Sequence, residues 1–185
     1  MSGTKIRPLK SEDSTELATL ANNIKIWNNV RDYFPNPYSL SDAQSFIHSK
    51  QQESPTLTLA IEYQGNLAGV IGLEPKTDVF RITSIVGYWI GEPYWGKGIA
   101  TAALNLLVQY AFMELDIVRL EAGHFDFNAA SGRVMEKCGF KKFGIAKKAA
   151  IKNNVIVDDH LYELINPKYQ YTQNGWYSRP LLFPT

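Results

Sequence analysis

Apolar positions along the chain follow two periodicities, which predict strands and amphipathic helices in mixed order. Seven segments alternate apolar with polar positions or are rich in β-branched and aromatic residues, as strands are. The polar turn Gln64-Gly-Asn66 joins two of them as a hairpin. The predicted strands are 4–9, 56–63, 67–73, 81–90, 117–123, 140–151 and 155–165.

Four other segments repeat apolar residues three and four positions apart, which indicates helices. Asp13-Ser-Thr-Glu16 and Ser41-Asp-Ala-Gln44 have the form of capping boxes and predict the start of the first two. The third carries Ala100 to Phe112 behind a glycine-rich loop. The fourth begins at Asn128, a suitable N-cap, and ends at Gly139, which suits the left-handed position after a helix.

Helices mixed with several hairpins predict an α+β fold, or α/β with a mixed sheet. A length of 185 residues predicts one domain over 1–185, with an irregular aromatic tail from about residue 166. Gly87 interrupts the strand 81–90 and predicts a bulge there. The loop 28–39 holds two prolines and several aromatic residues.

Composition excludes several classes of partner and site. Nineteen basic and 18 acidic side chains leave a net charge of +1, so bulk electrostatics favours neither nucleic acid nor an anionic membrane. One cysteine excludes an internal disulfide, and no Cys/His cluster has the spacing of metal ligands. Without an apolar run of about 18 residues, we expect a cytoplasmic protein, as a monomer or homodimer.

The glycine-rich loop 91–98 has three interpretations. Gly91-x-x-x-x-Gly96-Lys97 matches a Walker A loop, but Gly98 stands where a hydroxyl should bind magnesium. Gly96-x-Gly98-x-x-Thr101 lacks the third glycine of a dinucleotide fingerprint. The third interpretation is an anion site, because free backbone N–H groups at a helix N-terminus suit a pyrophosphate. The alternative to a binding site is an ordinary tight turn, in which the glycines serve only to relieve steric crowding of the backbone.

Two longer stretches narrow the choice. Tyr88 to Thr101, read with Asn128 to Phe140, resembles the GNAT acetyltransferases, and more narrowly the branch that contains the ribosomal-protein N-terminal acetyltransferases. The family loop usually begins with Gln or Arg, where this chain has Trp95, a residue common in that branch. Segments 34–38 and 159–162 also lie where related segments occur. The resemblance implies a mixed, mostly antiparallel sheet of about seven strands, a bulged fourth strand and helices on both faces.

The resemblance implies acetyl-CoA as co-substrate, and no metal. The pyrophosphate would lie on the backbone amides of the loop, and the pantetheine arm would pair with the fourth strand. Asn128 and Ser131 would contact the cofactor from the last helix. The cofactor-binding residues expected are Tyr88, Trp89, Ile90, Trp95, Gly96, Lys97, Gly98, Ile99, Ala100, Thr101, Asn128 and Ser131.

Three side chains are candidates for acid–base chemistry. Glu74 and His124, each at the end of a strand, are candidate bases. The alternatives are a solvated carboxylate beside Pro75 and a structural histidine, and a lone histidine is more often structural. Ser131 is a candidate donor to the departing sulfur, or a solvated helix hydroxyl. Many relatives have a glutamate on the fourth strand, and others have a tyrosine at the position of Met135. This chain has neither.

We therefore expect an N-acetyltransferase that moves an acetyl group from acetyl-CoA to a primary amine by direct attack in a ternary complex. A protein N-terminus is the favoured acceptor, because an α-amine with a pKa near 8 is partly neutral at pH 7 and needs little help from a base. One alternative is a non-catalytic acyl-CoA-binding module. The other is an enzyme for a small amine, either a polyamine or an antibiotic.

Overall fold

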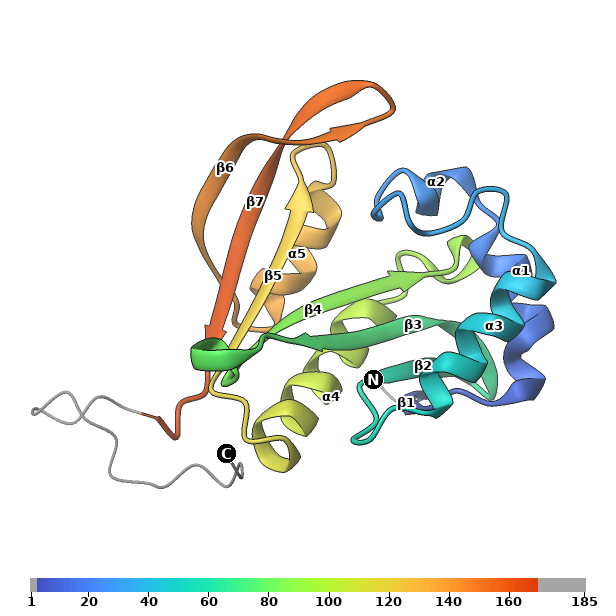
Figure 1. Cartoon of the computed structure of the whole chain (residues 1–185), viewed down its shortest axis with the longest axis horizontal. Coiled ribbons are helices and arrows are strands. Elements are labelled where there is room, and N and C mark those ends of the chain that lie inside the picture. The colour runs from blue at the N-terminus through green and yellow to red at the C-terminus, as the bar shows by residue number, and fades with distance from the viewer. Residues whose placement is uncertain (1–2, 170–185) are drawn as a thin grey trace, which may run out of the picture.

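The computed structural model describes residues 3–169, and its elements follow the predicted order (Figure 1). The strands are β1 (Thr4–Pro8), β2 (Thr58–Tyr63), β3 (Asn66–Pro75), β4 (Thr83–Ile90), β5 (Arg119–Phe125), β6 (Lys141–Lys152) and β7 (Val155–Ile165). The α-helices are α1 (Ser14–Ala21), α2 (Ile24–Trp27), α3 (Leu40–Gln51), α4 (Ile99–Glu114) and α5 (Ala129–Lys137). Short 3-10 helices are η1 (Ser11–Asp13), η2 (Asp78–Phe80) and η3 (Glu92–Tyr94).

All seven strands join one sheet in the order β1-β2-β3-β4-β5-β7-β6. Every neighbouring pair is antiparallel except β4 and β5, which run parallel. The seven predicted strands and the mostly antiparallel mixed sheet are therefore confirmed.

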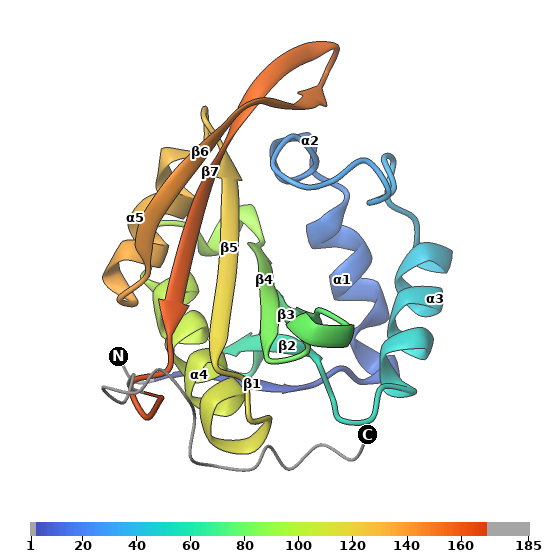
Figure 2. The ribbon, with the colours of Figure 1, turned by 60° about the vertical axis from the view of Figure 1, so that its left-hand side comes forward.

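Helices cover both faces of this sheet, as predicted (Figure 2). The hydrophobic core beneath α4 and α5 includes Ile71, Leu104, Leu107, Leu120 and Met135, all of them buried. A second core beneath α1 and α3 includes Leu17, Ala43, Ile47, Leu67 and Val70. Since adjacent residues of a strand point to opposite faces, β3 contributes Ile71 to one core and Val70 to the other.

The start of α3 lies two residues earlier than the predicted capping box at Ser41. The N-cap is Ser39, whose backbone is extended and whose Oγ accepts the N–H of Asp42 at 3.2 Å. The Asp42 carboxylate accepts the N–H of Ser39 at 2.8 Å in return. The box is therefore Ser39–Asp42, in which an aspartate takes the place usually held by Glu or Gln.

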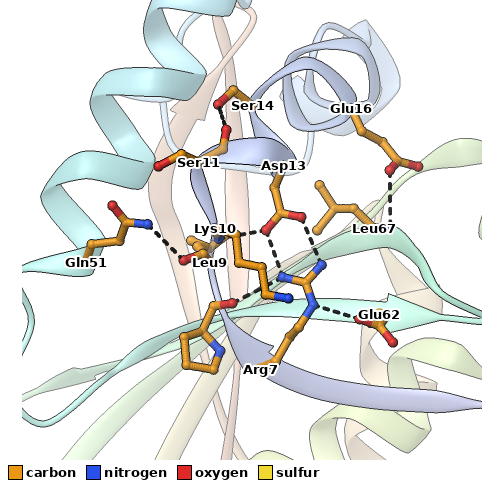
Figure 3. A network of polar contacts seen from close by, with 11 residues as sticks. Arg7, Leu9, Lys10, Ser11, Asp13, Ser14, Glu16, Gln51, Glu62 and Leu67 are labelled. Atoms are coloured by element: carbon orange, nitrogen blue, oxygen red, sulfur yellow. Dashed lines mark hydrogen bonds and ion pairs between the residues drawn. The ribbon is translucent and has the colours of Figure 1, made fainter.

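The predicted box at Asp13–Glu16 is wrong, because Asp13 does not cap α1 with its side chain. Its carboxylate accepts two bonds from the Arg7 guanidinium, at 2.8 and 2.9 Å, and the N–H of Lys10 at 2.8 Å (Figure 3). Arg7 also donates to Glu62 of β2 at 2.7 Å. Arg7 thus links the first two strands to the start of α1. Its charge-assisted bonds to the Asp13 carboxylate are stronger than the bond that the carboxylate would make as a helix cap.

The predicted bulge at Gly87 is also wrong. The ladder between β3 and β4 keeps one register from the pair Gly69–Ile90 to the pair Pro75–Ser84. Gly87 lies opposite another glycine, Gly72, in open space, so it fits a regular strand without an extra residue. The irregularity of β4 is on its other side, where it leaves β5.

The residue after the last helix and the asparagines of the last hairpin turn have the left-handed conformation that such positions require. Gly139 follows α5 with φ of +87°, and Asn153 and Asn154 turn the β6–β7 hairpin with φ of +52° and +62°. Lys152, predicted in that turn, is instead the buried last residue of β6. Of the predicted tail from residue 166, Asn166 is buried under α4, and residues 170–185 lie outside the described residues. Between residues 3 and 169, no helix is long and apolar enough to cross a membrane.

We predict that Asp13→Asn lowers the free energy of unfolding at pH 7 by about 2 kcal/mol, because hydrogen bonds to a charged partner are lost. Burial alone would raise the pKa of Asp13, but its bonds from Arg7 and Lys10 outweigh burial and lower it. The stabilisation is therefore present above the unfolded pKa near 3.9 and lost as the pH falls through the folded pKa. Urea unfolding at pH 7 and pH 3 should show the gap between the two proteins narrowing; a constant gap would contradict this.

Candidate functional site

The sheet opens between β4 and β5. Only three residue pairs join these parallel strands, from Thr83–Arg119 to Ile85–Glu121. Beyond Ile85, β4 remains paired with β3 and β5 with β7, and the two strands diverge (Figure 1). The facing edges of β4 and β5 are left without a neighbouring strand.

Backbone bonds determine which residues of β4 face this gap. The N–H of Gly91 donates to the carbonyl of Ala68 at 2.8 Å. At the other end, the N–H of Lys76 donates to the carbonyl of Thr83 at 2.9 Å. In one continuous antiparallel register, the odd-numbered residues of β4 therefore bond β3, and the even-numbered residues direct their N–H and C=O groups to the gap.

Val86, Tyr88 and Ile90 are the residues that face the gap. The Ile90 carbonyl already accepts the indole N–H of Trp95 at 2.6 Å, which fixes Trp95 at the end of the strand. Trp89 is also among the residues predicted to contact the cofactor. Its backbone bonds β3 instead of facing the gap, and its ring packs edge-on to Phe34. The edge of β4 thus offers peptide groups for an extended ligand, as an unpaired strand does.

The opposite wall is β5, where the even-numbered residues bond β7. This follows from the bond of Asp126 N–H to the carbonyl of Asp158, at 3.1 Å, in the same register as the rest of the ladder. Gly123 and Phe125 therefore direct their backbone groups to the gap. The Phe125 carbonyl is occupied by the N–H of Asn128 at 2.8 Å. Within the described residues, the free groups of this wall are therefore the N–H of Phe125 and both peptide groups of Gly123.

The loop before α4 presents a row of backbone donors beside the gap. Gly96 and Gly98 have φ of +74° and +75°, which turns the chain so that successive N–H groups point outward. Within residues 3–169, none of the six N–H groups from Gly96 to Thr101 has a hydrogen-bond partner. They open a 16-residue helix, whose positive end adds to their attraction for an anion.

Two further predicted contacts border this loop. The ammonium of Lys97 lies 5.5 Å from the ring centre of Tyr94, so its side chain folds back beside the exposed loop. The side-chain oxygen of Asn128 caps α5 by accepting the N–H of Ser131 at 3.3 Å, as predicted. The cap leaves the Asn128 amide NH₂ without a partner among the described residues.

Ser131 reaches the strand that lines the gap. Its Oγ lies 2.9 Å from the Tyr88 hydroxyl, which also approaches the Ser131 carbonyl at 3.2 Å. Burial raises the pKa of Tyr88 to about 12, so the phenol stays protonated and can donate. A hydroxyl pair from β4 and α5 therefore lies at the side of the gap covered by α5.

Glu74 lies at the closed end of the gap. It pairs across the ladder with Ile85, the last residue of β4 that still pairs with β5. Its carboxylate is exposed and lies 3.4 Å from the Arg31 guanidinium. The position is near the divergence, but the carboxylate already has a cation.

The His124 side chain lies on the opposite face of the sheet from that of Glu74. It is buried beneath α5, where its Nε2 would lie 2.7 Å from a Cβ at Gly132. Its Nδ1 lies 2.8 Å from the Phe125 carbonyl, and burial lowers the pKa of the ring. A neutral, packed imidazole favours the structural interpretation of His124.

Neither a thiol nucleophile nor a metal centre is present in the described part of the chain. Burial raises the pKa of Cys138 to about 11, and its Sγ donates to the Thr101 carbonyl at 3.4 Å. Residues 3–169 hold no group of three His, Cys, Asp or Glu side chains placed to bind a metal.

A cavity of about 500 Å³ lies beyond the open end of the gap. It is walled by α2, the loop before α4 and the hairpin tip, and its lining includes Trp95, Phe127, Lys152, Val155 and Val157. Buried Lys152 joins two of these walls: its ammonium bonds Asp32 at 2.6 Å and the Val30 carbonyl at 3.0 Å, 3.5 Å from the ring centre of Trp27. Sequence pattern missed this clamp, because a lysine beside a turn is usually solvated.

Comparison with known proteins identifies the arrangement. Residues 4–141 match the family model described as the acetyltransferase (GNAT) domain. The chain belongs to the GNAT family. The predicted resemblance is confirmed, and the matched range contains the whole gap and the loop before α4.

Relatives with known names cover the chain only in part. YjcK of Bacillus subtilis (strain 168), named a "Probable N-acetyltransferase", is 45% identical over 46% of this chain and 47% of its own length. YdaF of the same organism, named a "Putative ribosomal N-acetyltransferase", is 36% identical over 58% of each chain. The chain thus matches about half the length of these curated relatives.

A solved GNAT structure covers more of the chain. The microcin C7 self-immunity acetyltransferase MccE, determined in complex with acetyl-CoA and AMP, is 28% identical and superposes with a TM-score of 0.77. The match covers 89% of this chain and 93% of MccE. The two folds are therefore similar over most of both chains.

We predict that Gly96→Ala weakens binding of CoA at least about tenfold, because an alanine relieves its strain by leaving the left-handed region and turning the N–H row away. Gly65→Ala is the matched control, since Gly65 has φ of +86° and, like Gly96, no atom within 4 Å of an added Cβ. Both variants should lose about 1 kcal/mol of stability. Calorimetric titration with CoA should separate them; equal dissociation constants would contradict the role of the loop.

Proposed function

We propose that this GNAT protein transfers an acetyl group from acetyl-CoA to a primary amine by direct attack in a ternary complex. The observation that carries the proposal is the continuity of the row of free N–H groups from Gly96 to Thr101 with the unpaired edge of β4. A pyrophosphate suits the first and an amide-containing arm suits the second. Acetyl-CoA has both, joined in that order, and the MccE complex shows a similar fold that binds it.

The arrangement favours direct transfer over an acyl-enzyme. Cys138 is buried and protonated, so it offers no thiolate for a covalent intermediate. A neutral amine can attack the thioester itself, and the thiol leaving group has an ordinary pKa near 8.5. A protein α-amine fits this mild chemistry, and the name of YdaF supports a protein acceptor. The proposed co-substrate is that of a cytoplasmic enzyme.

Ser131 is the proposed donor to the departing sulfur. Its hydroxyl is paired with that of Tyr88, which can return a proton or hold the serine in place. Glu74 remains a candidate base, although its exposed carboxylate is already paired with the Arg31 guanidinium at 3.4 Å.

We predict that acetyl-CoA and CoA raise the melting temperature by about 5–10 °C at 100 times their dissociation constants, equivalent to about 2.7 kcal/mol. Magnesium-ATP and NAD should give no shift, because the loop lacks the residues that those ligands need. Thermal unfolding with each ligand tests this. A shift with magnesium-ATP alone would overturn the proposal.

Turnover is tested separately with a panel of amines: alanine- and serine-initiated peptides, an N-blocked lysine peptide and spermidine. The proposal expects release of CoA with at least one of them. Binding of acetyl-CoA without release of CoA across the panel would instead support a non-catalytic acyl-CoA-binding module.

We predict that Ser131→Ala lowers kcat by about tenfold and leaves the KM for acetyl-CoA within about twofold, because the hydroxyl acts on the developing thiolate rather than on binding. The exposed Ser41→Ala near the start of α3 is the control for loss of a helix serine. Steady-state kinetics measures both variants; an unchanged kcat in Ser131→Ala would remove Ser131 from the mechanism.

A further inference from the structure

Four carboxylates lie on the same face of the sheet around the divergence of β4 and β5. Direct partners across strands share a face, which places Glu74, Glu121 and Glu163 together through Ile85. Asp159 lies four residues before Glu163 on β7 and therefore points to that face too. This is the face opposite α5 and the Tyr88–Ser131 pair.

Three of the four carboxylates are neutralised by cations. Glu121 accepts from Lys76 at 2.6 Å and from Arg119 at 2.9 Å. Glu163 also pairs with Arg119, and Glu74 pairs with Arg31. Asp159 is half-buried, and within residues 3–169 its carboxylate has no hydrogen bond or ion pair.

The Asp159 carboxylate lies directly over β5 where the gap begins. A Cβ on Gly123 would be only 2.8 Å from its Oδ1, so the absence of a side chain at Gly123 makes room for it. Gly123 is the first gap-facing residue of β5 beyond Glu121, which is the last to pair with β4. Across the gap, nothing lies within 4 Å of a Cβ on Gly87, so the space facing the carboxylate is open.

The lining of the cavity described above comes within two residues of Asp159 along β7. Val157, which lines the cavity, lies two residues from Asp159 along β7, so the two side chains share a face. An amine at Asp159 whose substituent extends along β7 meets this lining between the hairpin and α2. The apolar lining of Trp95, Phe127, Val155 and Val157 suits a substituent with an apolar part.

We infer that Asp159 is the residue that binds the acceptor as an ammonium ion and takes its proton. The inference rests on the proposed acetyl transfer and names the base that sequence analysis assigned to Glu74 or His124. An unpaired carboxylate at the point of divergence attracts a cationic amine, whereas the paired carboxylates around it are already neutralised.

Asp159 and Ser131 together complete the proton balance. The Asp159 carboxylate takes a proton from the ammonium, and the freed nitrogen lone pair attacks the thioester carbonyl carbon. The C–N bond forms, the C–S bond breaks, and the sulfur leaves with the bonding pair. Asp159 passes the first proton to solvent, takes the second proton from the new amide nitrogen and passes it on in the same way. The Ser131 hydroxyl donates a proton to the thiolate and is reprotonated from solvent through Tyr88, so one proton is released overall.

The surroundings of Asp159 make its carboxylate a stronger proton acceptor than an exposed aspartate. Burial raises the pKa of Asp159, while His124 of β5, His160 of β7 and Arg31 of the loop after α2 oppose the rise. Of these, His124 has a pKa lowered by burial and is neutral at pH 7, and Arg31 is shared with Glu74. The net effect is a raised pKa, so the carboxylate is more basic than an exposed aspartate.

The test is Asp159→Asn, which keeps the shape of the side chain and removes its charge and basicity. With an alanine-initiated peptide, we expect kcat/KM to fall at least about 100-fold at pH 6.5, where the α-amine is protonated. Above about pH 9 the amine is neutral in solution, so the deficit should shrink to within about tenfold. The KM for the peptide should rise and the dissociation constant of acetyl-CoA should stay within about twofold.

Asp158→Asn is the matched control, because the neighbouring aspartate uses its Oδ1 only to accept the N–H of Lys148, which an asparagine can also do. Glu74→Gln is the rival variant. A merely structural role for Asp159 would lower kcat/KM by one factor at every pH, and this result would overturn the inference. So would a pH-dependent deficit in Glu74→Gln together with a normal profile in Asp159→Asn.

A second measurement covers the case in which no peptide is turned over. Calorimetric titration of the CoA complex with the same peptide should show binding by the wild type, and at least about tenfold weaker binding by Asp159→Asn. If acetyl-CoA binds but the peptide binds neither protein, or both equally, the inference fails while the donor site stands. If acetyl-CoA itself does not bind, the proposed function fails.

Discussion

The early end of the parallel ladder between β4 and β5 is the constraint on which the site depends. Three residue pairs hold the strands together, and after them each strand keeps a partner on one side only. Unpaired peptide groups are normally a liability at a sheet edge, because they invite pairing with another chain. Here they lie inside the molecule, between the loop before α4 and the capped start of α5, where an amide-containing arm can satisfy them. The same divergence exposes Gly123, and with it the carboxylate that lies across it.

The sheet was predictable because its signals are local. Alternation, hairpins and the left-handed Gly139 each follow from a few adjacent residues, and the structure confirms them except for the exact ends of the turns, such as Lys152. The errors arose where a distant partner competes for the same side chain. Asp13 has the spacing of a cap, yet Arg7 of β1 takes its carboxylate. Gly87 is permissive enough for a bulge, but its partner Gly72 allows a regular ladder.

The cofactor half of the site was more predictable than the acceptor half for a physical reason. In the proposed complex the donor meets backbone groups, and a loop that presents such groups needs glycines at positive φ, which are visible in the sequence as Gly96 and Gly98. The acceptor side is built from side chains of β3, β5, β7 and the loop after α2. Which carboxylate there is left without a cation depends on ion pairs such as Lys76–Glu121, between residues 45 positions apart. Sequence spacing does not reveal such a pair. It therefore cannot show that Glu74 has a cation partner and that Asp159 has none among the described residues.

The clamp at Lys152 extends this argument from charge to shape. Burying an ammonium is costly unless its donors are satisfied, and Lys152 meets a carboxylate, a carbonyl and an aromatic face at once. Two of those partners, Val30 and Asp32, belong to the loop after α2, which also carries Arg31, the cation of Glu74. Asn153 adds a bond from the hairpin turn to Asn28 at 3.0 Å. The segment 30–32 therefore has two roles. Val30 and Asp32 hold Lys152 in the cavity wall, and Arg31 between them pairs with Glu74. The shape of the proposed acceptor site and the separation of Asp159 from the paired carboxylates thus depend on the same segment.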